Sequence, residues 1–191
     1  CRSVFSRPGS TMISAPLPAQ SFCLIRHGET TANAAAIIAG ITDVALTPLG
    51  QNQARALAKS PLPKDFTLYS SPMSRALQTA RLAFPGREIH CHPGLRERDW
   101  GVFEGRPLCD QPTREATPDQ GESWLSMLAR VQSAITQICV TPQPLPVMVC
   151  HSGLIRAARV LWTTGESGNR PPNATPILFR KADKTLTEED L

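Results

Sequence analysis

The chain has no apolar run long enough to cross a bilayer, so a membrane-spanning protein is not expected. It also lacks a strong charge of either sign. The formal net charge over its 191 residues is only +4, and the lysines and arginines are scattered, without interleaved aromatic blocks. A nucleic-acid partner is therefore not expected. Internal repeats are absent as well, and the length suits one domain with a sizeable core.

Cys-x-x-Cys pairs are also missing, which leaves a structural zinc site with little support. Two of the six cysteines, Cys23 and Cys150, lie in apolar runs and are expected to be small core residues. A cytoplasmic, reduced protein fits this usage. The triplet at 90–92, His-Cys-His, could be read as a metal cluster, but strand alternation would point Cys91 away from both histidines. We therefore interpret the triplet as part of a surface loop.

The two ends of the chain are expected to lie outside one folded domain that spans residues 21–180. Residues 1–20 are rich in serine and proline and carry no acidic group. This composition favours a disordered extension, or residues that do not belong to the native protein; a transit peptide is the alternative. Whether residues 1–11 are native is left open, because Met12 stands just before the first apolar run. The charged tail, residues 181–191, is expected to fray.

Strand-like and helix-like segments alternate along the chain. Apolar runs of strand length occupy residues 22–26, 66–70 and 145–150, with shorter candidates at 88–90 and 177–179. Cap residues, proline at a first helical position and apolar spacing predict helices over residues 47–59, 71–85, 123–141 and 152–162. The alternation predicts an α/β fold with a mostly parallel central sheet covered by helices.

The clearest helix carries one apolar stripe at steps of three and four residues, which is typical of core packing. The stripe comprises Trp124, Leu128, Val131, Ile135 and Ile138. By contrast, residues 101–120 are irregular and polar. We expect them to form an excursion over the sheet edge, where a lid or a substrate loop would lie.

Two histidines come directly after strand-like runs. His27 stands between Arg26 and Gly28, and His151 follows the run that ends at residue 150. In open parallel sheets, ligands bind outside the carboxyl ends of the strands. Arg26 is already at such an end, and Arg75 is expected in the first turn of the helix after the second strand. Two imidazoles and two guanidinium groups favour an anionic ligand, and phosphate is the natural candidate.

An imidazole nitrogen in line with a bound phosphorus atom could attack it, and a phosphohistidine would split the transfer into two easier steps. The leaving alkoxide would need a proton, and Glu97 is the candidate donor. Each residue also has a structural interpretation, because a lone histidine at a strand end is more often structural than catalytic. Their joint placement at predicted strand ends favours the site.

Several segments resemble the motifs of the histidine phosphatase superfamily, the phosphoglycerate mutase-like enzymes. Residues 24–33, Leu-Ile-Arg-His-Gly-Glu-Thr-Thr-Ala-Asn, are similar to its signature. Further similar segments follow in the family's order at residues 40–54, 70–80, 95–105, 121–123 and 150–153. The resemblance runs from residue 21 to about residue 179. It implies a three-layer α/β/α fold and chemistry without a metal or another cofactor.

Carried over position by position, the resemblance implies roles for individual residues. His27 would be the phosphorylated nucleophile, and Glu97 the proton donor that later activates water. The phosphoryl group would be held by Arg26, Arg75, His151 and Asn33. Ser152 departs from the family pattern, in which glycine is common. We expect Ser152 to cap the following helix rather than to adopt a strained positive φ.

The superfamily contains hydrolases and mutases. In this chain the segment between Gly105 and Gly121 is short and broken by proline, and residues 99–100 differ from the mutase motif. A mutase must exclude water so that the phosphoryl group returns to the substrate. We therefore expect a metal-independent phosphatase that hydrolyses a small phosphorylated metabolite. The alternatives are a cofactor-dependent phosphoglycerate mutase and a non-catalytic phosphate-binding protein; the physiological substrate and the oligomeric state stay open.

Overall fold

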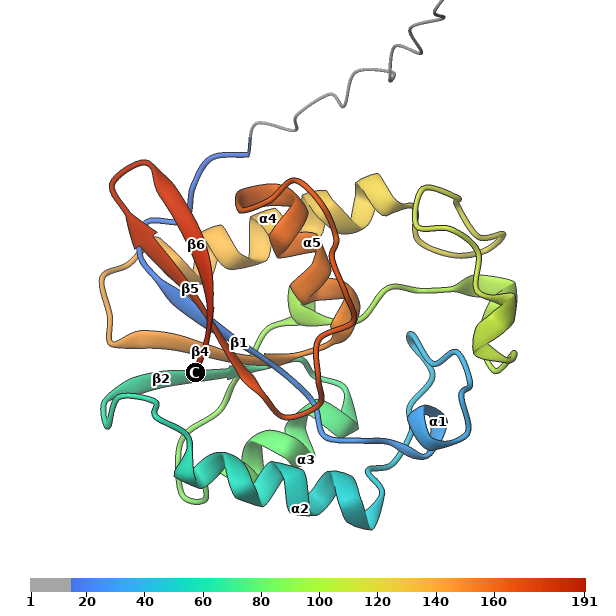
Figure 1. Ribbon diagram of the computed structural model, residues 1–191, viewed down its shortest axis with the longest axis horizontal. Helices are drawn as coiled ribbons and strands as arrows, with labels where there is room; N and C mark the ends of the chain where they lie inside the picture. The colour runs from blue at the N-terminus through green and yellow to red at the C-terminus, as the bar shows by residue number, and fades with distance from the viewer. Residues whose placement is uncertain (1–14) are drawn as a thin grey trace, which may run out of the picture.

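A six-stranded sheet forms the centre of the computed structural model, which describes residues 15–191 (Figure 1). The strands lie in the order β3-β2-β4-β1-β5-β6. Their bounds are β1 Phe22–Arg26, β2 Phe66–Ser70, β3 His90–Cys91, β4 Leu145–Cys150, β5 Pro176–Ala182 and β6 Thr185–Asp190. Neighbours from β3 to β1 pair in parallel, and β5 and β6 add an antiparallel edge. The predicted mostly parallel sheet is confirmed.

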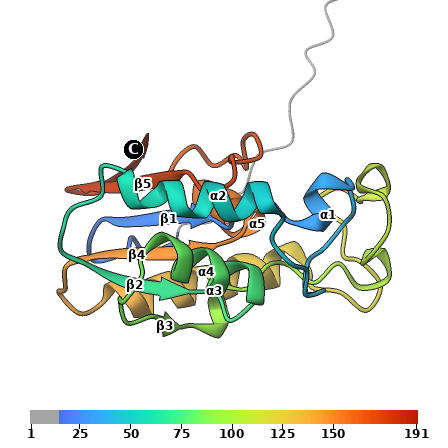
Figure 2. The ribbon, with the colours of Figure 1, turned by 90° about the horizontal axis from the view of Figure 1, so that it is seen from below.

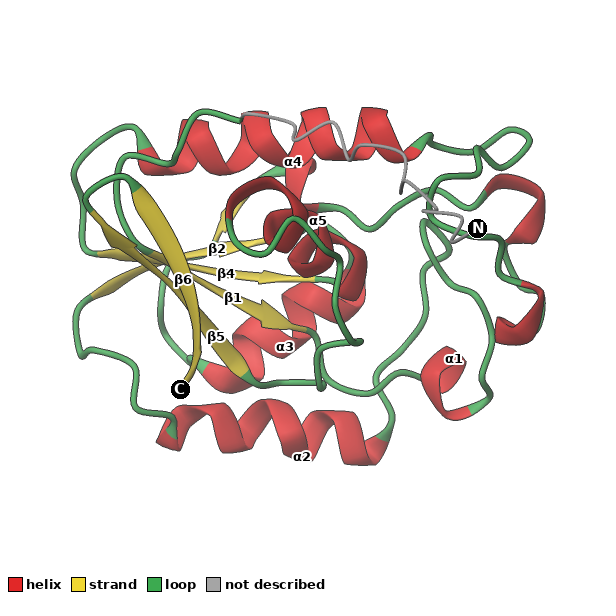
Figure 3. Cartoon of the chain, turned by 45° about the horizontal axis from the view of Figure 1, so that its top comes forward, coloured by secondary structure: helices red, strands yellow, loops and turns green. Residues whose placement is uncertain are grey.

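Helices cover both faces of this sheet (Figures 2 and 3). The α-helices are α1 Thr31–Ala34, α2 Pro48–Ala56, α3 Ser74–Ala83, α4 Trp124–Cys139 and α5 Ser152–Trp162. Short 3-10 helices span Leu57–Lys59, Pro93–Leu95, Gly101–Phe103 and Leu108–Asp110. Helices α4 and α5 lie on one face, and α2 and α3 on the other, so the three-layer architecture is confirmed. No helix within residues 15–191 is long and apolar enough to cross a membrane.

The continuous apolar run of β1 reflects burial on both faces of the sheet. Phe22 and Leu24 pack with α4 and α5, whereas Cys23 and Ile25 belong to the core on the side of α3. Successive strand residues point to opposite faces, so a central strand needs apolar side chains at every position. Complete burial of a large apolar side chain stabilises the fold by about 1.5–3 kcal/mol. Strand β1, which carries the candidate nucleophile at its end, is therefore firmly held.

Helix α4 matches the predicted apolar stripe. Ser123 is its N-cap, and the Ser123 Oγ accepts a hydrogen bond from the Ser126 amide at 3.0 Å. Four stripe residues are buried against the sheet and Trp124 is half-buried. The helix ends at Cys139, ahead of the prolines that follow.

One predicted helix start and one predicted helix cap are wrong. Helix α3 begins at Ser74 with Met73 as its N-cap, not at Ser71. The Ser71 amide instead donates to the Val149 carbonyl at 2.9 Å, which prolongs the pairing of β2 with β4. Ser152 is not the cap of α5, because the N-cap is His151 and Ser152 is already helical.

The two predicted chain ends are also partly wrong. Residues 181–191 do not fray, because β6 pairs with β5, Leu186 is buried, and Arg180 and Glu189 form an ion pair at 2.8 Å. The opposite charges of Arg180 and Glu189 thus pair across the β5–β6 hairpin. Residues 15–20 are part of the fold, since the Trp162 Nε1 donates to the Pro16 carbonyl at 3.1 Å. Residues 1–14 lie outside the described chain.

Helix α1 and the excursion, residues 101–120, lie together beyond the carboxyl ends of the central strands (Figures 1 and 3). The segment after α1 pairs with the excursion through an isolated bridge between Ile37 and Pro107. The Leu108 amide donates to the Ala36 carbonyl at 2.7 Å. The excursion therefore covers the end of the sheet at which the predicted site residues meet.

Candidate active site

The two strand-end histidines meet at the centre of the sheet. Strands β1 and β4 are parallel neighbours, and the His27 amide donates to the Cys150 carbonyl at 3.0 Å. The rings of His27 and His151 consequently lie with their centroids 5.2 Å apart. More than a hundred residues of chain separate the two histidines, so the parallel pairing alone brings them together.

The ring of His27 is set up with one free nitrogen. Its Nδ1 lies 2.7 Å from the Gly28 carbonyl, and a carbonyl oxygen can only accept, so Nδ1 carries the proton. Burial lowers the pKa of His27 well below its ordinary value, and the charges of Arg75 and Arg26 lower it further. The imidazole is therefore neutral at pH 7, with the lone pair of Nε2 available for attack.

Glycine is required at position 28 because the backbone of Gly50 lies very close to its Cα. A Cβ at Gly28 would lie 2.3 Å from the Gly50 carbonyl oxygen near the start of α2. The Gly28 amide also donates to the Thr79 Oγ1 at 3.0 Å. The loop that follows His27 is thus pinned between α2 and α3.

His151 is buried, and its ring is hydrogen-bonded to the hydroxyl of Ser71. Its Nε2 lies 2.8 Å from the Ser71 Oγ, whereas its Nδ1 is buried and has no partner within residues 15–191. Burial, then the charge of Arg75, lower the pKa of His151 well below its ordinary value. The Ser71 Oγ also accepts from the Met73 amide at 3.4 Å, and its own proton can be donated to Nε2. This orientation of the hydroxyl would place the His151 proton on Nδ1, from which it could be donated to an anion.

Backbone carbonyls hold Arg26 and Arg75 in place. The Arg26 Nη1 donates to the Pro171 carbonyl at 2.8 Å, and the Arg75 Nη1 and Nη2 donate to Thr42 and Gly40 at 2.9 and 2.6 Å. The Nε of each arginine is buried without a partner in the described part of the chain. Burial lowers the pKa of Arg26 to about 10, with Arg170 adding to the effect. Both arginines thus remain cationic and keep an unused donor.

Glu104 supports the loop that holds Arg75. Its carboxylate accepts hydrogen bonds from the amides of Gly40 and Thr42 and from the Thr42 hydroxyl, at 3.0, 3.2 and 2.6 Å. It also accepts from the Trp100 amide at 3.1 Å. Glu104 therefore ties the backbone at Trp100, three residues after Glu97, to the loop whose carbonyls orient Arg75.

Glu97 lies against the start of α5. Its Oε2 accepts from the Gly153 amide at 3.0 Å and its Oε1 from the Arg98 amide at 2.9 Å. A Cβ at position 153 would lie 2.1 Å from the Glu97 Oε1, so glycine is required there for the carboxylate to fit. The backbone around Glu97 is fixed by Arg130, which donates to the Arg96 carbonyl at 2.9 Å and pairs with Glu122.

A single cavity collects most of the predicted site residues. Arg26, His27, Asn33 and Glu97 line it, whereas Arg75 and His151 do not. These two are almost fully buried, and both lie close to His27. The ring of His151 is 5.2 Å from that of His27, and the positive charge of Arg75 lowers the pKa of both histidines. The Asn33 Oδ1 caps α1 by accepting from the Thr30 amide at 3.2 Å.

Five further residues at the site were not predicted. They are Ser71, Arg114, Arg156, Arg170 and Asn173. The Asn173 Nδ2 donates to the His27 carbonyl at 2.8 Å. Helical spacing could have found Arg156, which follows Ser152 by one turn. The segments around Arg114 and Arg170 have no periodicity that would place them.

The alternative metal site at residues 90–92 finds no support. Cys91 lies in β3 and is exposed, and the His92 Nδ1 accepts from the Gly94 amide at 3.1 Å. Across residues 15–191, no three His, Cys, Asp or Glu side chains gather as a metal site would require.

Comparisons with known proteins agree with this geometry. A family model described as "Histidine phosphatase superfamily (branch 1)" matches residues 22–174. The chain is 34% identical over 145 residues to "Probable phosphoglycerate mutase GpmB" of Proteus mirabilis, a match that covers 67% of each protein. It is 31% identical over 157 residues to "Putative phosphoserine phosphatase 2" of Hydrogenobacter thermophilus, covering 73% of this chain and 77% of that protein.

A solved structure shows the same fold. It is titled as a "putative alpha-ribazole-5'-P phosphatase" from Escherichia coli, and the two share a TM-score of 0.76 at 25% identity. The match covers 91% of this chain and 96% of the other.

Proposed function

Because this chain belongs to the histidine phosphatase superfamily (branch 1), we propose that it hydrolyses small phosphomonoesters through a phosphohistidine on His27. The observation that carries the proposal is the state of the His27 ring. Its proton is held on Nδ1 by the Gly28 carbonyl, and its low pKa keeps Nε2 unprotonated at neutral pH. A nucleophile of this kind needs no separate base.

In the first step, the Nε2 of His27 attacks the phosphorus, an N–P bond forms and the P–O bond to the leaving alcohol breaks. Arg26, Arg75 and the Nδ1–H of His151 stabilise the charge on the phosphoryl oxygens. Glu97 lines the same cavity as His27 and gives its proton to the leaving alkoxide. Asn33 is a further polar contact at the cavity wall.

In the second step, Glu97 takes a proton from water, the oxygen attacks the phosphorus and the N–P bond breaks. Inorganic phosphate leaves, and His27 returns to its neutral state. Glu97 also lines a second depression together with Asp99, Gln120 and Arg130. This gives solvent a second approach to the acid, which supports hydrolysis over a reaction that must exclude water.

Phosphoglycerate mutase activity is the second candidate. It is favoured by the similarity to the Proteus mirabilis protein named as a probable mutase. Both activities would use the same phosphohistidine. They differ in the acceptor of the phosphoryl group, which is water for a hydrolase and a second hydroxyl for a mutase.

A substrate panel tests the proposal. The protein is incubated with sugar phosphates, 3-phosphoglycerate and a chromogenic aryl phosphate, and both free phosphate and isomerised phosphoglycerate are measured. Phosphate release supports the hydrolase, isomerisation supports the mutase, and neither product would leave a non-catalytic phosphate-binding protein. We expect phosphate release that a chelator does not inhibit; inhibition would revive a metal-dependent mechanism.

A further inference from the structure

The cavity carries more positive charge than one phosphoryl group requires. Besides Arg26, it is lined by three residues that we name the outer arginines: Arg114 of the excursion, Arg156 of α5 and Arg170 of the loop after α5. Within the described chain, Glu97 is the sole acidic residue among its lining residues. A phosphate dianion is matched by Arg26 with Arg75 behind it, so the outer arginines form no ion pair with any residue from 15 to 191 and keep their charge for another anion.

The outer arginines also have few hydrogen-bond partners. The Arg114 Nη1 is buried and has none, and neither Arg114 nor Arg170 donates a hydrogen bond to any residue from 15 to 191. Arg156 donates to one residue, the carbonyl and hydroxyl of Ser167, at 3.4 and 3.2 Å. A buried N–H without an acceptor costs free energy, which an incoming anion would recover.

A neighbouring arginine on α5 is paired with a carboxylate, so the shortage of partners is particular to the arginines that line the cavity. Arg159 follows Arg156 by three residues in α5 and forms an ion pair with Glu188 at 2.6 Å. Arg156 pairs with no carboxylate among residues 15–191, and burial lowers its pKa to about 10, with Arg114, Arg159 and Arg170 adding to the effect. The cationic side chains therefore repel one another across the cavity, and bound negative charge would relieve the repulsion.

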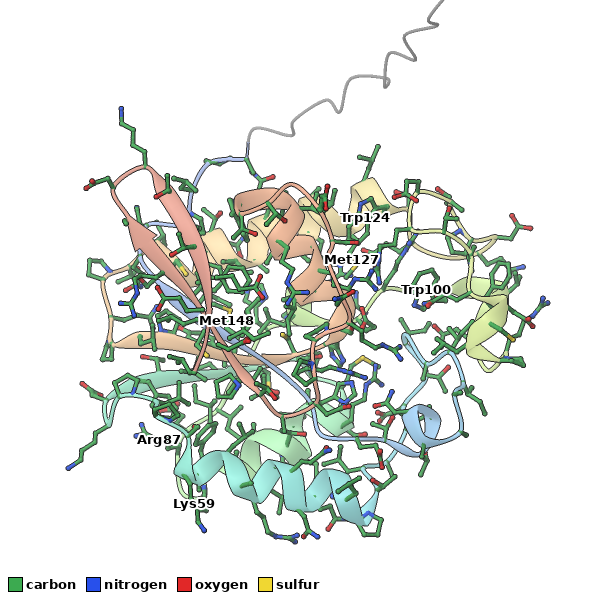
Figure 4. The ribbon with its side chains drawn as sticks, viewed as in Figure 1. Lys59, Arg87, Trp100, Trp124, Met127 and Met148 are labelled. Atoms are coloured by element: carbon green, nitrogen blue, oxygen red, sulfur yellow. The ribbon has the colours of Figure 1, made fainter. Side chains whose placement is uncertain are left out.

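Arg114 is held in position although its guanidinium donates no hydrogen bond to the described residues. Arg98 is fully buried, and its Nη1 and Nη2 donate to the carbonyls of Arg114 and Ala116 at 2.9 and 2.6 Å. The Arg114 guanidinium lies 5.5 Å from the centre of the Trp124 ring. Figure 4 shows Trp124 near the start of α4. A preorganised cation loses little freedom when it binds an anion.

Apolar side chains line the same cavity as the charges. Its lining includes the side chains of Ile38, Trp100 and Leu108. They provide a surface for a short carbon skeleton between a phosphoryl group at His27 and a second group at the outer arginines.

From this arrangement we propose that the outer arginines form a subsite for a second anionic group, so that the preferred substrate is a small phosphomonoester that also carries a carboxylate or a second phosphate. The subsite rests on the proposed function, since it assumes that the first phosphoryl group lies at His27. It assigns roles to three arginines that the phosphoryl-transfer steps do not use.

Matched substrate pairs test the subsite. 3-Phosphoglycerate and glycerol 3-phosphate differ by a carboxylate in place of a hydroxymethyl group, and fructose 1,6-bisphosphate and fructose 6-phosphate differ by one phosphate. We expect the wild-type kcat/KM to favour at least one of the two more anionic esters by about 10- to 100-fold, the range of a charge-assisted hydrogen bond. The pair that shows the preference identifies the source of the anion.

Arg114→Gln should reduce that preference to less than about 3-fold. The matched control is Arg106→Gln, an exposed arginine of the same excursion that does not line the cavity. The control should keep the wild-type preference, and raising the salt concentration should weaken it in the wild type. Equal kcat/KM within both substrate pairs, or an unchanged preference in Arg114→Gln, would overturn the subsite.

Binding separates a failure of the subsite from a failure of the proposed hydrolysis. If no ester is turned over, the hydrolase proposal fails, and the same four compounds are titrated into the wild type and Arg114→Gln by calorimetry. Tighter wild-type binding of a more anionic member, reduced in Arg114→Gln, would support the subsite alone. Equal affinities within both pairs would overturn it.

Discussion

The site has an inner and an outer end, and their arginines differ in burial and in hydrogen-bond partners. At the inner end, Arg26 and Arg75 are buried, and backbone carbonyls of residues 40, 42 and 171 fix their guanidinium groups. At the outer end, Arg114 and Arg156 are half-buried and Arg170 is exposed, with few partners or none in the described chain. Both ends are cationic, but the guanidinium groups of the inner end are bound to backbone carbonyls, whereas those of the outer end keep most of their donors unused.

This difference indicates that the inner end serves catalysis and the outer end serves substrate recognition. Fixed dipoles and charges that need no rearrangement stabilise a transition state most effectively, which suits the inner end. Side chains with unused donors can accept one ligand and reject another, which suits recognition at the outer end. Changes at the inner end should therefore reduce the rate with every substrate, and changes at the outer end should alter the choice among substrates.

The largest effect is expected at the inner end, from His27→Ala. Loss of the nucleophile should lower kcat by about 10⁴-fold or more with every ester, because no other group in the cavity can form the covalent intermediate. Acid-labile phosphoenzyme should be trapped from the wild type and not from the variant. His90→Ala, at an exposed histidine, is the control and should retain both signals. A nearly wild-type rate in His27→Ala would disprove the assignment.

Glu97→Gln should be next in size. It removes the proton donor and keeps the size that fits against Gly153, although one glutamine N–H must face the amide of Gly153 or Arg98; it should cost about 10²–10⁴-fold on alkyl phosphates. On an activated aryl phosphate the leaving group needs little protonation, so the loss of the first step should be much smaller. Single-turnover measurement of phosphoenzyme formation compares the two esters. An equal loss on both would contradict the role of Glu97 as acid.

The inner end was largely predictable from the sequence because strand ends are easy to recognise. The apolar runs before His27 and His151 had the length of buried strands, and parallel pairing places such ends together. Arg75 was predicted from its expected place in the helix after the second strand, and Glu97 as a nearby proton donor; the family motifs then supported both residues. What the sequence could not show is that Ser71, taken for a helix cap, instead contacts His151.

The outer end was not predictable for a physical reason. Arg114 and Arg170 lie on irregular segments, whose conformation depends on long-range contacts such as the hydrogen bonds from Arg98 to the Arg114 carbonyl. The expectation that residues 181–191 fray is wrong for the same reason, because the charges of β6 are matched by β5 and α5 only in the folded chain. Local pattern identifies buried elements, and it says little about polar segments that are held by distant partners.

Glu104→Gln tests whether the inner end depends on its supporting loop. The amide of glutamine would replace one acceptor oxygen with a donor that faces the amides of Gly40 and Thr42. The displaced loop should misorient Arg75 and cost up to about 10²-fold in kcat/KM on all esters alike. Inorganic phosphate should also inhibit more weakly. The control is Glu88→Gln, an exposed carboxylate; normal kinetics in Glu104→Gln would show that Arg75 does not need this support.

Ser71→Ala should have a smaller effect, on the order of 10-fold in kcat, the size expected from one hydrogen bond. Without the hydroxyl, the proton of His151 is no longer directed to Nδ1. Ser70→Ala is the matched control, because Ser70 is equally buried but its hydroxyl donates to a backbone carbonyl, that of Ser71, at 2.9 Å. Ser71→Thr, which keeps a hydroxyl, should recover part of the rate. Equal losses in Ser70→Ala and Ser71→Ala would point to packing instead.

The smallest effect concerns stability, and it distinguishes the neutral histidines of the inner end from the cations around them. Because the pKa of His27 and of His151 lies well below 6.5 in the folded protein, the unfolded chain takes up protons first as the pH falls. The free energy of unfolding should therefore decrease below about pH 6.5, by about 1–1.5 kcal/mol per histidine at pH 5.5. Denaturant unfolding at pH 7.5 and 5.5 measures this decrease. Carboxylates also contribute to the pH dependence of stability, so the deciding comparison is with His151→Gln, in which the decrease between pH 7.5 and 5.5 should be smaller. An identical decrease would mean that His151 is not held neutral in the folded protein.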